Sequence, residues 1–259
     1  MVAIAFIGTI QHEIAKDAVR KLVDTVKAKA AGDSIIVCNA DGLFLTSSKL
    51  GEQLEMLFDN GIDLVMVGEQ AISRNCCRSV LAKSDWPVLR GFNLPGSTAL
   101  TSIKCLNHKD EAFWFISTCG QKGKISVDNS YIKLDEFFQN KNDDLPVIIN
   151  ESCSDFKYLQ ALTWRYSKKG CTLLIFGSGT GFMTMPSLYA ENNFLLCDTG
   201  SVASENTIFG IEPELWWKKN IDRRALTLLP KWGALKCDYT VVRFDKGKIT
   251  DYFVESVRI

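Results

Sequence analysis

Short apolar runs alternate with amphipathic segments through the first two thirds of the chain. Residues 2–8 form a run that ends at a glycine, after which Ile14, Ala18, Leu22 and Val26 recur every four residues. The first pattern predicts a buried strand and the second a helix with one apolar face. The alternation continues, predicting strands at 34–38, 62–67, 88–92, 101–106, 112–118, 146–150 and 172–176, helices at 47–60, 73–82 and 154–167, and a short helix within 128–140.

Strands that alternate with helices predict parallel strands joined by crossovers, with functional loops at the carboxyl ends of the strands. Thr9, residues 39–41 and Glu69-Gln70 occupy such ends. The last part of the chain differs, because runs at 238–244 and 249–257 flank Asp245-Lys246-Gly247-Lys248, a hairpin signal. No internal repeat or linker divides the sequence, so we predict a single α/β domain over residues 1–259.

Charge gives no global signal for an anionic partner, since 30 Lys and Arg balance 30 Asp and Glu. One local cluster places Lys218, Lys219, Arg223 and Arg224 around Trp216-Trp217. Such a mixture can hold phosphate and stack on a base. It also fits a helix whose aromatic side chains anchor it to the body while its basic residues face water.

The N-terminal run has no basic flank and no small-residue cleavage site, so it predicts a first strand and not an export signal. No window approaches the ~18 apolar residues that a membrane helix needs. Nine cysteines are scattered without any C-x-x-C spacing. These features predict a cytoplasmic protein with reduced and mostly buried thiols.

A series of motifs follows in order at residues 6–10, 39–42, 60–63, 67–71, 89–96, 149–152, 176–184 and 197–200. Over nearly the full chain, these motifs resemble those of the bacterial YmdB-type metallophosphoesterases. The resemblance implies a calcineurin-like fold, a four-layer sandwich of two mixed β-sheets flanked by helices. It also implies a dinuclear iron or manganese site at the strand ends and hydrolysis of phosphodiesters, cyclic nucleotides included. Two such metals clamp phosphate and make hydroxide available near neutral pH.

The positions that match the family's metal ligands carry different residues here. The chain has two histidines, His12 and His108, and neither falls at a matched position. A histidine-rich dinuclear centre therefore cannot be assembled from this sequence, because imidazole is the usual ligand of iron and glycine offers no side-chain donor. The matched positions are Thr9, Ala40, Asp41, Glu69, Gln70, Glu151, Gly179 and Gly181.

Two functional hypotheses follow from these departures. The first is a catalytically inactive relative that acts as a binding or scaffold protein, with no cofactor expected and a small phosphate or nucleotide as a possible ligand. Its partner is another protein or a second copy, with the aromatic runs 113–115 and 216–217 either anchoring that interface or filling the core. The alternative is a phosphodiesterase acting on cyclic nucleotides or RNA through Mg²⁺ or Mn²⁺ held by Asp41, Glu69 and Glu151.

Three further features carry two interpretations each. The glycine-rich run 177–181 fits either an anion cradle of backbone amides or the remnant of a metal-binding loop. His12 fits either a general acid at the pocket mouth or a surface or capping histidine. Asp198, which precedes Thr199-Gly200, is expected to support the pocket structurally.

Overall fold

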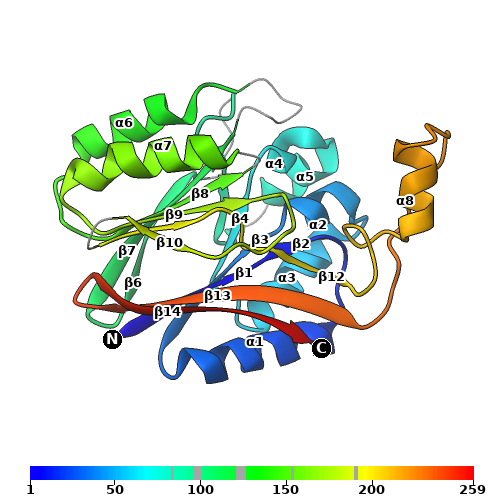
Figure 1. Cartoon of the computed structure of the whole chain (residues 1–259), viewed down its shortest axis with the longest axis horizontal. Coiled ribbons are helices and arrows are strands. Elements are labelled where there is room, and N and C mark those ends of the chain that lie inside the picture. The colour runs from blue at the N-terminus through cyan, green and yellow to red at the C-terminus, as the bar shows by residue number, and fades with distance from the viewer. Residues whose placement is uncertain (83–84, 96–100, 121–126, 153–154, 190–191) are drawn as a thin grey trace.

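Two β-sheets stack face to face between layers of helices in the computed structural model (Figure 1). The structure describes residues 1–82, 85–95, 101–120, 127–152, 155–189 and 192–259. Both sheets contain parallel and antiparallel pairs. The predicted sandwich of two mixed sheets flanked by helices is therefore confirmed.

The first sheet, sheet A, is built mainly from the N-terminal third and the C-terminal hairpin. β1, β3, β4 and β5 run parallel, and β13 pairs antiparallel with β1. The long hairpin partner β14 pairs with β13 in turn. The order is β2 (Thr9–Ile10), β12 (Ser201–Ser204), β13 (Leu235–Asp245), β1 (Val2–Ile7), β3 (Ser34–Asn39), β4 (Leu64–Val67) and β5 (Val88–Arg90), with β14 (Lys248–Arg258) beside β13.

The second sheet, sheet B, comes from the middle of the chain. Its centre is parallel, and an antiparallel strand closes each edge. The order is β10 (Ser187–Tyr189), β11 (Asn193–Leu196), β9 (Leu173–Ser178), β8 (Val147–Ser152), β7 (Glu111–Cys119) and β6 (Ile103–His108).

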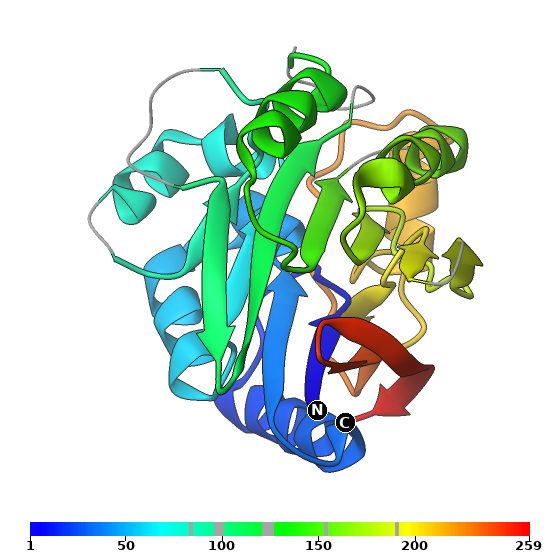
Figure 2. The ribbon, with the colours of Figure 1, turned by 90° about the vertical axis from the view of Figure 1, so that its left-hand side faces the viewer.

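Helices cover the outer face of each sheet. α1 (Lys16–Ala30) buries Val19, Leu22, Val23 and Val26 against sheet A, as its four-residue apolar spacing predicts. α3 (Leu50–Asp59) lies on the same face, and α6 (Ser130–Asn140) and α7 (Phe156–Tyr166) cover sheet B (Figures 1 and 2). The other helical elements described before residue 170 are α2 (Asp41–Thr46), α4 (Gln70–Ser73), α5 (Asn75–Leu81) and the short 3-10 turn Ser167–Lys169.

The facing sides of the two sheets form a continuous apolar core. Alternate residues of each strand point inward, so Ile4 and Phe6 of β1 meet Ile148 of β8 and Phe176 of β9 in one cluster. The Phe6 and Phe176 rings lie 4.5 Å apart. This core holds the two sheets in a fixed relation and so positions the carboxyl ends of their strands.

A segment between β12 and β13 stands out from this body. We call residues 205–234 the arm; it carries α8 (Pro213–Asn220), drawn in orange at one end of the molecule (Figure 1). No residue from 211 to 234 is buried. Trp217 is 56% exposed and so does not anchor this helix to the body, whereas Trp216 is half-buried.

The cysteines follow the expected pattern in most positions. Among those that the structure describes, Cys38, Cys77, Cys119, Cys171 and Cys237 are buried free thiols, whereas Cys76 is exposed. Cys153 lies outside the described residues. Of the helices described, none has the length and apolar character needed to cross a membrane.

Candidate functional site

A polar layer replaces the apolar core where the strands end. On β8 the inward positions run from apolar Ile148 to Asn150 and Ser152, and on β9 from Phe176 to Ser178. Asn39 ends β3 at the same level of the opposite sheet, and all of these side chains are buried. We call these residues, together with Asp41 and Ser117, the inner polar layer.

Asp41 lies at the centre of the inner polar layer. Its Oδ2 accepts hydrogen bonds from Ser152 Oγ at 2.8 Å and from Asn39 Nδ2 at 3.3 Å. Its Oδ1 accepts from the backbone N–H of Gly68 at 2.8 Å. Both carboxylate oxygens are thus engaged by donors of the chain itself.

The remaining members extend this network across sheet B. Asn39 Nδ2 also donates to Ser178 Oγ at 3.0 Å, and Ser178 donates to Asn150 Oδ1 at 2.9 Å. Asn150 Nδ2 donates to Ser117 Oγ at 3.3 Å. Hydroxyl and amide groups therefore satisfy one another across the space between the sheets, as buried polar groups in stable proteins do.

Packing around Asp41 is tight. A Cβ added at Gly68 would lie 2.2 Å from Ser152 Oγ and 3.1 Å from Asp41 Oδ2. Burial raises the pKa of Asp41, against the opposing hydrogen bonds from Ser152 and Gly68. The carboxyl group is thus enclosed by protein atoms and held in one orientation.

Glu151 does not belong to this layer, which corrects the expected set of cation ligands. It alternates with Asn150 and Ser152 along β8, so its side chain points to the outer face of sheet B. There Glu151 accepts hydrogen bonds from Thr118 and, at 3.0 Å, from Ser130 at the start of α6. The structure therefore does not gather Asp41, Glu69 and Glu151 around one point, and Ser152 is the residue of β8 that faces Asp41.

The other matched positions provide few side-chain atoms that could bind a metal ion. Ala40 has no side-chain atom that could bind a metal ion. Glu69 is buried near Asp41, and Gln70 donates a hydrogen bond to Glu69 at 3.2 Å. Thr9 is buried, and its hydroxyl has no partner among the described residues. These four residues and Asp41 do lie at the carboxyl ends of the sheet A strands, as the pattern predicts.

The glycine-rich loop is organised by Asp198. Thr180 donates to Asp198 Oδ2 through its backbone N–H at 2.7 Å and its hydroxyl at 2.8 Å, while Gly200 N–H donates to Oδ1 at 2.7 Å. The backbone of Gly181 also bonds to Asp198. The backbone amides of Thr180 and Gly181, which an anion cradle would need, are thus directed at an internal carboxylate. Asp198 supports the loop structurally, as the sequence predicts.

His12 is neither a surface histidine nor a residue of the inner polar layer. Only 2% of its surface is exposed. Its Nδ1 lies 2.7 Å from Glu13 O, its Nε2 lies 3.4 Å from Ser204 Oγ, and its ring meets Trp232 edge-on with centroids 5.4 Å apart. His12 therefore packs under the base of the arm.

A dinuclear iron or manganese centre does not fit the residues described here. Within the described ranges, no three His, Cys, Asp or Glu residues come close enough to hold a metal ion. The inner polar layer instead offers serine hydroxyls and asparagine amides, which are weak ligands for such metals and already bond to each other.

The chain belongs to the YmdB-like protein family, whose model matches residues 5–254. This membership places it among metallophosphoesterase-like proteins and confirms the resemblance seen in its motifs. A comparison with curated proteins gives no match.

Solved structures agree on the fold. A hypothetical protein from Thermus thermophilus is 18% identical with a TM-score of 0.84, over 99% of both chains. A novel phosphatase from Mycoplasma pneumoniae is 15% identical with a TM-score of 0.83, over 99% of this chain and 93% of its own. The NAD nucleotidase of Haemophilus influenzae is 8% identical with a TM-score of 0.61, over 99% of this chain and 56% of its own. The calcineurin-like sandwich is thus shared across distant sequences.

Proposed function

We propose that the protein is a catalytically inactive member of its family and acts as a binding or assembly protein. The observation that carries the proposal is the bonding of Asp41, whose two carboxylate oxygens accept hydrogen bonds from Ser152, Asn39 and Gly68. A metal ligand needs lone pairs directed at the ion, whereas three of the roughly four lone-pair sites of this carboxylate are directed at internal donors. Rearranging them would leave several buried donors without acceptors, at a cost of about 1–3 kcal/mol each.

The residue types support the same proposal. Hydrolysis by a two-metal site needs anionic or imidazole ligands that bring two ions about 4 Å apart. In the inner polar layer Asp41 is the acidic member, and its other members are Asn39, Ser117, Asn150, Ser152 and Ser178. Retention of the fold without this chemistry favours a role that depends on surfaces.

Metal content and hydrolysis test the proposal together. The purified chain is incubated with excess Fe²⁺, Mn²⁺ or Mg²⁺, desalted and analysed for bound metal, then assayed on bis(p-nitrophenyl) phosphate, a cyclic nucleotide and a short RNA. We expect no stoichiometric metal and no turnover above the level of an Asp41→Ala variant. Two metal ions per chain with turnover lost in Asp41→Ala and kept in Glu151→Gln would overturn the proposal.

A further inference from the structure

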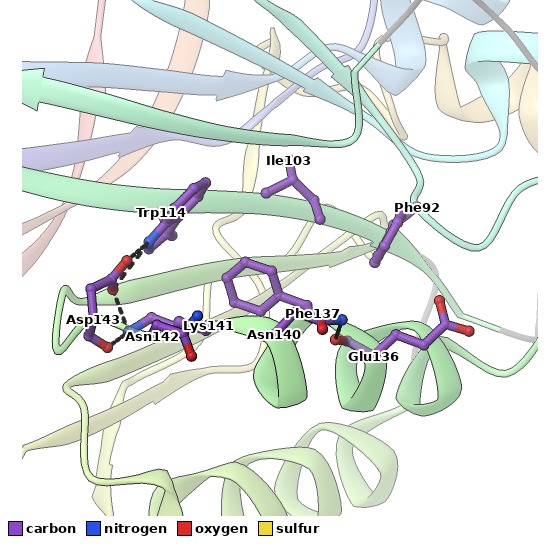
Figure 3. Close-up of a pocket in the computed structure, with 9 residues that line it drawn as sticks. All are labelled: Phe92, Ile103, Trp114, Glu136, Phe137, Asn140, Lys141, Asn142 and Asp143. Carbon is purple, nitrogen blue, oxygen red and sulfur yellow. Dashed lines mark hydrogen bonds and ion pairs between the residues drawn. The ribbon is translucent and has the colours of Figure 1, made fainter.

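Two pockets open beside sheet B, and their linings differ. One lies between α6 and the edge of the sheet and has a volume of about 580 Å³. The charged side chains at its rim are paired, Lys141 with Asp143 at 2.7 Å and Glu136 with Lys133 at 2.9 Å. Its polar groups therefore leave little for a ligand. Its apolar walls are Phe92, Ile103, Trp114 and Phe137 (Figure 3).

The second pocket lies at the end of the molecule opposite α8, beside the turn between β13 and β14 (Figure 1). We call it the hairpin pocket; its volume is about 550 Å³. The turn, the segment that leads into β9 and the start of β11 surround it. The polar side chains that matter here are those of Asp144, Thr172, Asn192, Asn193, Lys246 and Lys248.

The backbone around the hairpin pocket is fixed by the fold. Gly247, in the turn, donates its N–H to Glu111 Oε2 at 3.1 Å. On the other side, the N–H of Leu173 donates to Asn192 O at 3.3 Å and so ties β9 to the segment before β11. The lining side chains thus extend from a frame that exists before any ligand binds, which reduces the entropic cost of binding.

Asn193 is a buried polar residue that its own chain leaves unsatisfied. It is 4% exposed, and its Oδ1 has no hydrogen-bond partner. Most buried polar side chains have at least one partner, because an unpaired buried amide lowers the stability of the folded state. A ligand in the pocket that bonds to this amide would remove that unfavourable contribution.

Lys246 and Lys248 give the hairpin pocket its positive charge. Both side chains are exposed, and neither forms an ion pair within the part of the chain that the structure describes. Asp144, also exposed, opposes them with one carboxylate. Two ammonium groups attract an anion, whereas a carboxylate repels an anion and accepts hydrogen bonds from hydroxyl groups. The lining therefore suits a ligand that carries both an anionic group and hydroxyl groups.

The lysines and the amide approach the pocket from different sides of sheet B. Asn193 shares its face of β11 with Leu195, which packs in the cluster under α7. Lys246 and Lys248 belong to the hairpin of sheet A, on the other face. An elongated ligand would reach both, with its anionic group at one end and its hydroxyl groups at the other.

From these observations we infer that the hairpin pocket binds a small phosphorylated sugar. The phosphate lies beside Lys246 and Lys248, and the hydroxyl groups bond to Asn193 and Asp144. Phosphate forms strong charge-assisted hydrogen bonds with ammonium groups, and hydroxyl groups both donate and accept, as a carboxylate and an amide require. The inference goes beyond the proposed function, because the pocket lies at the amino ends of β9 and β11 and the inner polar layer at the carboxyl ends of strands.

Titration calorimetry tests the ligand class. Ribose 5-phosphate, ribose and inorganic phosphate are each titrated into the purified chain in the presence of EDTA. We expect one ribose 5-phosphate per chain with a dissociation constant below about 1 mM, and binding at least about tenfold weaker for ribose or phosphate alone. Equal binding of inorganic phosphate would show that the lysines hold a simple anion and would overturn the inference, as would no binding at all.

Removal of the two lysines locates the phosphate against a matched control. Lys246→Ala/Lys248→Ala should raise the dissociation constant of ribose 5-phosphate by about tenfold or more. Lys219→Ala/Arg223→Ala removes the same charge from exposed positions in the arm and should leave binding within about twofold. An equal loss in both double variants would show a general effect of net charge and not a bound phosphate.

Substitution of Asn193 separates a role in binding from a role in the fold. Asn193→Leu removes an amide whose Oδ1 has no partner, so the urea midpoint of unfolding should not fall. The dissociation constant of ribose 5-phosphate should nevertheless rise by about fivefold or more. A lower midpoint with unchanged binding would show that Asn193 serves the fold alone. These outcomes are independent of metal content and hydrolysis, so either proposal can fail by itself.

Discussion

The inner polar layer buries polar side chains, whereas the arm exposes apolar ones. In the inner polar layer Asp41, Asn39 and Ser152 are buried, and each hydrogen-bonds to another part of the chain. In the arm, Trp217 and Leu229 are apolar and more than half exposed. Both regions depart from the ordinary arrangement of a globular protein, in which apolar groups lie inside and polar groups outside.

The difference indicates where interactions with other molecules are to be sought. A buried network whose donors and acceptors satisfy each other stabilises one conformation and leaves little for a ligand. Exposed aromatic side chains gain free energy only when a partner covers them. At the strand ends the polar side chains thus bond to one another, whereas the arm leaves apolar side chains in contact with water.

The largest effect should come from overfilling the inner polar layer. Gly68→Ala places a Cβ 2.2 Å from Ser152 Oγ and so breaks the bond from Ser152 to Asp41. We expect the free energy of unfolding, measured in urea, to fall by more than about 3 kcal/mol. Gly51→Ala is the control, because its Cβ meets nothing closer than 3.9 Å and alanine favours the α3 helix. An equal loss in both variants would contradict tight packing of the layer.

The free energy of unfolding should depend on pH through Asp198, the carboxyl group that organises the glycine-rich loop. Burial raises the pKa of Asp198 from 3.8 to about 6. The folded state therefore binds this proton more tightly than the unfolded state, and the resulting stabilisation is lost as the pH rises from about 4 to about 6, by up to about 3 kcal/mol. Unfolding free energies across this range should fall with pH in the natural chain and fall less in Asp198→Asn. Parallel curves would contradict the raised pKa.

An intermediate effect is expected from removing the central charge. Asp41→Asn keeps an acceptor for the Gly68 N–H but turns one carboxylate oxygen into a donor that faces Asn39. We expect a loss of about 1–2 kcal/mol in urea unfolding at pH 7, reduced by the release of a buried charge. Binding of Mn²⁺ that protects the natural chain and not this variant from unfolding would contradict the closed network.

The smallest effect should come from the arm. Trp217→Ala removes a side chain that is 56% exposed and touches no buried cluster, so the unfolding free energy of the monomer should change by less than about 0.5 kcal/mol. The measurement is made at a protein concentration at which the chain is monomeric. A loss comparable to that of Gly68→Ala would show that α8 packs on its own body.

The apolar runs predict most strands and helices and their alternation, whereas the two-sheet sandwich is implied by the resemblance of the motifs to the family. Alternation along β8, continued from Ile148, points Asn150 and Ser152 inward, whereas motif order alone matches Glu151 to a ligand position. The alternation of inward and outward side chains along β8 is the signal in the sequence that identifies Ser152. The local patterns do not predict the short strands β2, β10, β11 and β12 or the helix α2, since their conformations depend on long-range pairing and packing.

Placement of the arm was also beyond local patterns. From sequence alone, Trp216-Trp217 with four basic neighbours fits a helix anchored to the body or a site that holds phosphate and stacks on a base. The base of the arm is fixed by contacts far apart in the chain, such as Trp232 with His12 and Phe209 with Phe182. These contacts direct α8 away from both sheets.

The pairing of β1 with β13 has a consequence for biosynthesis. β1 is made well before β13, yet one of its edges is completed only by residues 239–244 of that strand. During translation β1, β3, β4 and β5 can pair among themselves while that edge keeps its hydrogen-bonding groups unmet. That edge of β1 therefore stays open to pairing with other chains until β13 has been made.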